Sequence, residues 1–141
     1  MSIHAIELHM DKMSQIFDLL EQLTTAFAFE KERFDKIIYS LPKNHRIFLY
    51  IEDQKVIGMI TVIIEQKLIH NGSCVGHIED LVVDKEYRKQ KIGNKLLEYV
   101  INYAKQNNCY KIILDCNKDL IPFYNKNGFK EKECQMAMYF Y

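Results

Sequence analysis

A chain of 141 residues with 19 basic and 19 acidic side chains carries no net charge that would attract nucleic acid or an anionic membrane surface. Its composition, 48% hydrophobic and 27% charged, is typical of a globular domain with a buried core. No apolar run reaches the roughly 20 residues that span a bilayer, and the first residues lack the basic and apolar parts of a signal peptide. We therefore expect one cytoplasmic domain over residues 1–141 that binds neither nucleic acid nor membrane.

The cysteines do not form a metal-binding pattern. They lie at Cys74, Cys109, Cys116 and Cys134, without any C-x-x-C pair, and only five histidines accompany them. We expect no metal site, and in a reducing compartment we expect these cysteines to be buried free thiols.

The N-terminal part of the chain is predicted to contain a strand and two helices. Residues 3–9 favour a short strand, after which Asp11 can cap a helix. Apolar residues recur in that helix with helical spacing, at Met13, Ile16, Phe17, Leu20 and Leu23. A second helix is expected over residues 30–40, and Pro42 ends it.

A β-hairpin is predicted next. Its strands cover residues 47–52 and 55–69, and its turn falls at Asp53 and Gln54. Residues 56–64 are nearly all apolar, which is typical of a central strand.

The second half of the chain is predicted to alternate strands and helices. The expected elements are a strand over residues 76–84, an amphipathic helix over 93–106, a buried strand over 110–116, a short helix over 120–126 and one or two closing strands from residue 129. Gly128 suits the left-handed position that follows a helix. This order predicts an α+β fold of three layers, with a mixed central sheet and helices on both faces.

Residues 81–93 combine the end of a strand, a short basic loop and the start of a helix. A helix N-terminus offers unpaired backbone N–H groups and the positive end of a dipole, which favour an anion. Arg88, Lys89 and Lys91 add positive charge there, although neither a Walker A pattern nor a G-x-G-x-x-G pattern is present. The loop alone is equally consistent with an anion site and with an ordinary solvated basic loop.

Two segments resemble the GCN5-related N-acetyltransferases (GNAT superfamily). Residues 87–93, Tyr-Arg-Lys-Gln-Lys-Ile-Gly, resemble that superfamily's pyrophosphate loop, Arg/Gln-x-x-Gly-x-Gly/Ala, with Lys91 in place of the middle glycine. Residues 123–129, Phe-Tyr-Asn-Lys-Asn-Gly-Phe, resemble its closing F-Y-x-x-x-G-F segment. The resemblance implies the GNAT fold with a mostly antiparallel sheet, acetyl-CoA as co-substrate and no metal.

Further segments, at residues 64–70, 76–80 and 109–116, are similar to GNAT enzymes that acetylate glucosamine 6-phosphate in the biosynthesis of UDP-N-acetylglucosamine. The resemblance implies direct attack of the sugar amine on the thioester in a ternary complex. The sugar contacts that it implies are Thr24, Lys67, Leu68, Ile69, His70, Glu79, Asp80, Leu81, Tyr110 and Lys111.

The resemblance also implies the contacts of acetyl-CoA. The backbone N–H groups of Leu81, Val82 and Val83 would hold the pantetheine arm and the thioester carbonyl. The pyrophosphate would lie on Arg88, Lys89, Gln90, Lys91, Ile92, Gly93 and Asn94. The remaining donor contacts would come from Asp115, Phe123, Tyr124 and Lys126.

Acetyl transfer to an amine needs a proton acceptor for the amine and a proton donor for the leaving thiolate. Tyr124 is the candidate donor, because phenols titrate near ~10, close to a thiol, and the resemblance gives it the same role. Glu79 and Asp115 are both candidate acceptors, and the sequence leaves the choice open. Because neighbours on a strand point to opposite faces, we expect Glu79 and Asp80 not to form a matched pair, with at least one in the site.

The C-terminal residues 136–141 are apolar and aromatic, and no Arg or Lys follows Lys132. Related enzymes often place an arginine near this end, where it reaches the sugar phosphate across a dimer interface. An exposed aromatic strand promotes aggregation, so we expect a homodimer that buries this segment.

Two other functions remain open at this point. One is a GNAT enzyme that acetylates another small amine or a protein N-terminus. The other is a module that binds CoA without turnover.

Overall fold

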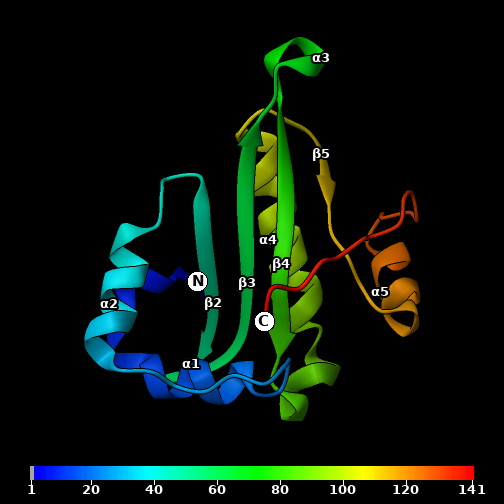
Figure 1. The fold of residues 1–141 in the computed structure, drawn as a ribbon. Coiled ribbons are helices and arrows are strands. Elements are labelled where there is room, and N and C mark those ends of the chain that lie inside the picture. Colours follow the sequence, from blue (N-terminus) through cyan, green and yellow to red (C-terminus); the bar gives the residue numbers. More distant parts are fainter. Residues whose placement is uncertain (1) are drawn as a thin grey trace.

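The computed structural model describes residues 2–141 and has a central mixed sheet (Figure 1). Five strands of the described chain lie in the order β1-β2-β3-β4-β5. They are β1 (Ile3–Ala5), β2 (His45–Glu52), β3 (Lys55–Gln66), β4 (Cys74–Val83) and β5 (Cys109–Ile113). The first four pair antiparallel, and β5 pairs parallel with β4. The predicted mixed, mostly antiparallel sheet is confirmed.

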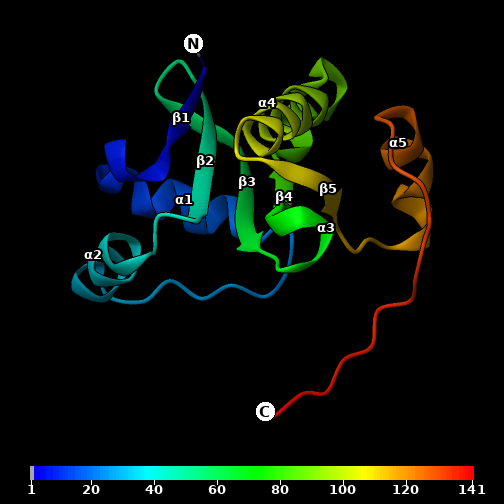
Figure 2. The ribbon, with the colours of Figure 1, turned by 90° about the horizontal axis from the view of Figure 1, so that it is seen from above.

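Helices cover both faces of this sheet (Figure 2). The α-helices are α1 (Met13–Leu20), α2 (Lys31–Ser40), α3 (Ile69–Gly72), α4 (Ile92–Gln106) and α5 (Ile121–Lys126). Short 3-10 helices are η1 (Ile6–Leu8), η2 (Met10–Lys12), η3 (Lys85–Gln90) and η4 (Lys118–Leu120). Within residues 2–141, no helix is long and apolar enough to cross a membrane.

Two hydrophobic cores lie on opposite sides of the sheet. Because side chains alternate along a strand, Phe48 and Tyr50 of β2 pack into the core beneath α4, and Leu49 between them packs into the core beneath α1 and α2. The same division separates Val56 from Ile57 on β3. The sheet is therefore the middle of three layers, as the sequence predicted.

Several local predictions hold at the hairpin and at the helix ends. Asp53 and Gln54 both have positive φ, as a tight hairpin turn between β2 and β3 requires. Gly128 follows α5 with φ 92°, and α2 ends at Ser40, two residues before Pro42.

The N-terminal strand is shorter than predicted, and Asp11 does not cap a helix. The chain leaves the sheet after Ala5, because Ile6 turns into the core beneath α1 and α2 and is 1% exposed. A second 3-10 turn, η2, then precedes α1, so that Lys12 takes the N-cap position without a side-chain hydrogen bond. Leu23 lies beyond the end of α1.

The predictions for the C-terminal part were wrong in two respects. The strand β5 is not buried: it lies at the edge of the described sheet, and Tyr110 and Ile113 are 37% and 41% exposed. Residues 129–141 contain no strand, because the chain runs away from the sheet there and has no strand neighbour (Figure 2).

The expectation that the cysteines are buried was wrong for three of the four. Only Cys74 is buried; Cys109 is intermediate, and Cys116 and Cys134 are exposed.

Gly58 of β3 allows α4 to approach the sheet closely. A Cβ at this position would lie 3.0 Å from Leu96 Cδ1 and 3.2 Å from Ile92 Cγ2, both in the core beneath α4. We predict that Gly58→Ala lowers the free energy of unfolding by about 1–3 kcal/mol through overpacking, measured by urea unfolding. Gly76→Ala on β4 is the control, since its Cβ would make ordinary contacts at 3.4 Å or more; equal losses in the two variants would contradict this account.

Candidate active site

A cavity of about 540 Å³ opens where β4 and β5 separate. The pairing of the two strands ends at His77 and Ile113, so from Ile78 onward β4 has no neighbour on that side among the described strands. Backbone groups on this edge are available to another partner, as the resemblance implies for the arm of acetyl-CoA. The lining residues are Leu23, Thr24, Ile78, Glu79, Asp80, Leu81, Leu114, Asp115, Cys116, Asn117, Leu120, Tyr124 and Gln135.

Tyr124 lies on α5 and lines this cavity while being only 9% exposed. Its ring packs edge-on against Phe123 and Phe129, with centroids 5.0 and 5.8 Å away. Burial, and next the nearby thiol of Cys116, raise the pKa of Tyr124. The phenol therefore keeps its proton at neutral pH, which is the state a proton donor needs.

Three carboxylates, from Glu79, Asp80 and Asp115, line the same cavity. The expectation that Glu79 and Asp80 lie on opposite faces was wrong. Asp80 has φ 51°, and the register between β3 and β4 shifts between Met59 and Thr61, so a β-bulge breaks the alternation. Both neighbouring side chains thus reach one cavity.

The pKa of Glu79 is raised, first by desolvation and then by the negative charges of Asp80 and Asp115, while His77 opposes the shift. A raised pKa makes Glu79 a stronger base when it is ionised. Asp115 has a different environment, because Nε2 of Gln135 donates to its Oδ2 at 3.1 Å. The C-terminal segment thereby contacts a candidate proton acceptor.

The basic loop adopts a defined conformation between β4 and α4. Residues 85–90 form η3, and Lys91 then takes a left-handed conformation, φ 59° and ψ 28°, immediately before α4. This conformation favours glycine, which explains why the superfamily pattern has a glycine at this position. Lysine therefore replaces the glycine here without removing the turn.

The loop is joined to α5 through the first turn of α4. A Cβ on Gly93 would lie 3.2 Å from the ring of Phe123, so glycine permits this close approach. Asn94 Nδ2 donates to Oδ1 of Asn127 (3.3 Å), and Asn127 Nδ2 donates to the carbonyl of Phe123 (2.9 Å). The loop and the helix that carries Tyr124 thus form one packed unit.

The predicted donor contacts fall around this unit. Leu81, Asp115 and Tyr124 line the cavity, while the side chain of Val82 is buried in the core beneath α1 and α2 and its backbone lies opposite Met59 of β3. The contacts predicted in the loop and the helices lie on η3, at the start of α4 and on α5: Arg88, Lys89, Gln90, Lys91, Ile92, Gly93, Asn94, Phe123 and Lys126. Arg88 Nε donates back to the carbonyl of Val83 at 3.1 Å.

The predicted sugar contacts separate into two groups. Thr24, Glu79, Asp80 and Leu81 line the cavity. The others lie outside its lining, on β5 and around α3 at the far tip of the β3–β4 hairpin (Figure 1): Lys67, Leu68, Ile69, His70, Tyr110 and Lys111.

Some side chains of this second group contact one another or a neighbouring residue. The rings of His70 and Tyr110 stack with centroids 3.9 Å apart, and Lys67 pairs with Glu65 at 3.0 Å. Leu68 beside them is 95% exposed.

Sequence reasoning did not select seven of the lining residues, and Leu23 and Cys116 are two examples; the others are Ile78, Leu114, Asn117, Leu120 and Gln135. Leu23 belonged to the predicted apolar face of the first helix, and Cys116 was expected to be buried. No local pattern distinguishes either of them, because the cavity forms only when distant segments meet.

Comparison with known proteins agrees with this geometry. A sequence model described as "Acetyltransferase (GNAT) family" matches residues 13–129. The chain belongs to the GNAT family of acetyltransferases, whose donor is acetyl-CoA.

Its relatives include enzymes with one named activity. The chain is 37% identical over 135 residues to "Glucosamine 6-phosphate N-acetyltransferase" of Arabidopsis thaliana, a match that covers 92% of this chain and 91% of that protein. It is 35% identical to the protein of the same description from Candida albicans, over 92% and 90% of the two chains. The crystal structure of the Arabidopsis thaliana enzyme superimposes with a TM-score of 0.91 at 34% identity, over 98% of this chain and 97% of that chain.

Proposed function

We propose that this chain transfers the acetyl group of acetyl-CoA to the 2-amino group of D-glucosamine 6-phosphate. The observation that carries the proposal is that Tyr124 and the carboxylates Glu79, Asp80 and Asp115 meet in one cavity beside the free edge of β4. Relatives that match nearly the whole chain are described by this activity. The product, N-acetyl-D-glucosamine 6-phosphate, would supply UDP-N-acetylglucosamine biosynthesis.

The loop and the start of α4 would hold the donor. The first N–H groups of an α-helix have no partner within the helix, and they stand at the positive end of its dipole. In α4 these groups belong to Ile92, Gly93 and the residues that follow, directly after the basic η3. Together they would bind the pyrophosphate of acetyl-CoA, while the unpaired edge of β4 would bind the pantetheine arm.

The chemistry would be direct attack in a ternary complex. The amine must lose a proton to attack, and Glu79, whose pKa is raised, is the acceptor that we propose, with Asp115 the alternative. The N–C bond forms as the C–S bond of the thioester breaks. Tyr124 would give its proton to the departing thiolate, and the raised pKa of this phenol keeps that proton available.

Removing the phenol hydroxyl tests the role of Tyr124. We predict that Tyr124→Phe lowers kcat about 10²–10⁴-fold, the usual contribution of a positioned proton donor. The Kd of acetyl-CoA should change little, because the ring keeps its packing against Phe123 and Phe129. The measurements are CoA thiol release at saturating substrates and calorimetric binding of acetyl-CoA; equal losses in kcat and affinity would contradict the donor role.

The acceptor is tested by thiol release from acetyl-CoA with a panel of amines. We expect turnover with glucosamine 6-phosphate and much weaker turnover with glucosamine, which lacks the phosphate. Turnover with a different small amine or a peptide N-terminus, and none with the phosphosugar, would replace the proposed acceptor. Binding of acetyl-CoA without thiol release for any amine would instead support a non-catalytic module.

We further propose a homodimer. The C-terminal side chains are strongly exposed in the single chain, 93% for Met136, 79% for Met138 and 86% for Phe140. Apolar area of this kind favours burial against a partner. The hairpin tip with Lys67 and His70 lies outside the cavity lining of its own chain, so a second subunit would be needed for it to contact the sugar phosphate as the resemblance implies.

Light scattering measures this assembly directly. We predict a particle of twice the chain mass of 16.8 kDa at micromolar concentration, and a single-chain mass after deletion of residues 136–141. A single-chain mass for the full chain would refute the dimer.

A further inference from the structure

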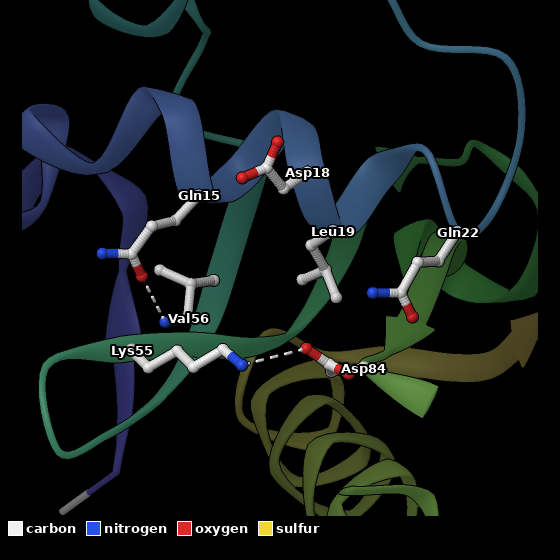
Figure 3. A pocket seen from close by; sticks show the side chains of 7 residues that line it. All are labelled: Gln15, Asp18, Leu19, Gln22, Lys55, Val56 and Asp84. Atoms are coloured by element: carbon white, nitrogen blue, oxygen red, sulfur yellow. Dashed lines mark hydrogen bonds and ion pairs between the residues drawn. The ribbon is translucent and has the colours of Figure 1, made fainter. Parts of the chain in front are cut away.

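A second groove, of about 300 Å³, lies between α1 and the sheet and shares no lining residue with the active-site cavity (Figure 3). Gln15, Leu19 and Gln22 line it from α1 and the turn after it, and Lys55 and Asp84 line it from the sheet side. Asp84, which lies between β4 and the basic loop, lines this groove. The contacts inside the groove therefore affect how the loop is held.

Besides Asp18, three residues line the groove from the α1 side, Gln15, Leu19 and Gln22, and their spacings of four and three place them along one face. Leu19, in the middle, is 2% exposed. Oε1 of Gln15 accepts the backbone N–H of Val56 at the start of β3 (2.8 Å). Oε1 of Gln22 accepts the N–H of Lys85, the first residue of η3 (2.9 Å). Two side chains of the same type thus hold two different segments.

The first three backbone N–H groups of the loop all have hydrogen-bond partners within the protein. The N–H of Lys85 donates to Gln22, and the N–H of Glu86 donates to Oδ1 of Asp84 (3.0 Å). The N–H of Tyr87 donates to the carbonyl of Asp84 (2.8 Å). These three groups are consequently occupied before any ligand arrives, and the loop direction is set by them.

The side chain of Asp84 is held by burial and by an ion pair. It is 8% exposed, and its Oδ2 lies 3.5 Å from Nζ of Lys55. Figure 3 draws this ion pair as a dashed line. The hydrogen bond from Glu86, and then the charge of Lys55, lower the pKa of Asp84 despite its burial. The carboxylate is therefore ionised at neutral pH. The same ammonium lies 5.2 Å from the centroid of the Tyr87 ring, which ties a third point of the loop to β3.

We propose that Gln22 and Asp84 are positioning residues for the donor, which hold η3 in the conformation that binds the pyrophosphate of acetyl-CoA without touching it. Leu23 and Thr24, which follow Gln22, line the active-site cavity. One short segment therefore links the donor loop to the acceptor side. This inference rests on the acetyl-CoA part of the proposed function and is independent of the identity of the amine.

The test compares Gln22→Met with the matched control Gln15→Met. Methionine keeps the length of the side chain and removes the acceptor, and only the first variant releases an N–H of the loop. For Gln22→Met we expect the calorimetric Kd of CoA and the KM of acetyl-CoA to rise about 5–10-fold, the equivalent of one lost hydrogen bond. Its kcat at saturating acetyl-CoA should stay within about twofold of the parent value.

The control and a rescue separate positioning from general weakening. Gln15→Met should lower the Tm to a similar degree and leave the Kd of CoA unchanged. Gln22→Glu keeps an acceptor for the N–H of Lys85 but loses the amide that hydrogen-bonds Asp84 and adds a negative charge beside it, so it should restore only part of the affinity. Asp84→Asn keeps an acceptor for Glu86 but loses the charge opposite Lys55, and should fall between the parent and Gln22→Met.

Amide hydrogen exchange provides a readout without ligand or turnover. The peptide covering residues 85–91 should exchange faster in Gln22→Met than in Gln15→Met. Equal Kd values in the two variants, unchanged exchange, or a loss confined to kcat would overturn the inference. If the parent protein binds CoA but does not acetylate the phosphosugar, only the proposed acceptor fails; if it does not bind CoA, the inference fails with the donor assignment.

Discussion

The separation of β4 from β5 is the constraint on which the rest of the structure depends. A strand edge that is left open inside a folded protein presents backbone groups that need partners, and most sheets close such an edge with another strand or cover it. Here the parallel pairing stops after His77 and Ile113, and the chain then departs toward α5. The cavity at this opening has the polar groups of Thr24, Glu79, Asp80 and Asp115 on its walls.

The elements around the opening are connected by side-chain packing and hydrogen bonds. Gly93 brings the start of α4 against Phe123, and the two asparagines at positions 94 and 127 connect the same helices by a hydrogen bond. On the other side, Gln22 connects the loop to the segment that carries Thr24. Groups that would bind the pyrophosphate, donate the proton and meet the acceptor therefore share one rigid frame. Catalysis by proximity depends on such a frame, because small displacements of reacting groups reduce rates strongly.

The sequence predicted features that depend on local chemistry. Asp53 and Gln54 mark a tight turn and Gly128 follows a helix, and the structure confirms both; the anion site in the basic loop before α4 stays a prediction. The sequence did not predict features that depend on contacts between distant segments. The bulge at Asp80 arises from the register with β3, and it places two neighbouring carboxylates in one cavity against the expected alternation. Likewise, apolar residues after position 129 suit a strand by composition, but a strand also needs a neighbour to pair with, which the single chain does not supply. Gln22 resembles any surface glutamine until the fold brings the loop beside it.

The left-handed conformation of Lys91 affects how this protein responds to heat and denaturant. A glycine in the left-handed conformation needs little support, whereas a lysine there is held by its surroundings at a cost of about 1 kcal/mol or more. The shape of the donor loop is then a property of the tertiary structure rather than of the residue itself. Heat or denaturant that loosens the packing around α1 would release the loop before the sheet melts. If the loop binds the donor as proposed, donor affinity would depend on the conformational stability of this region, and the donor would in turn protect the region from local unfolding.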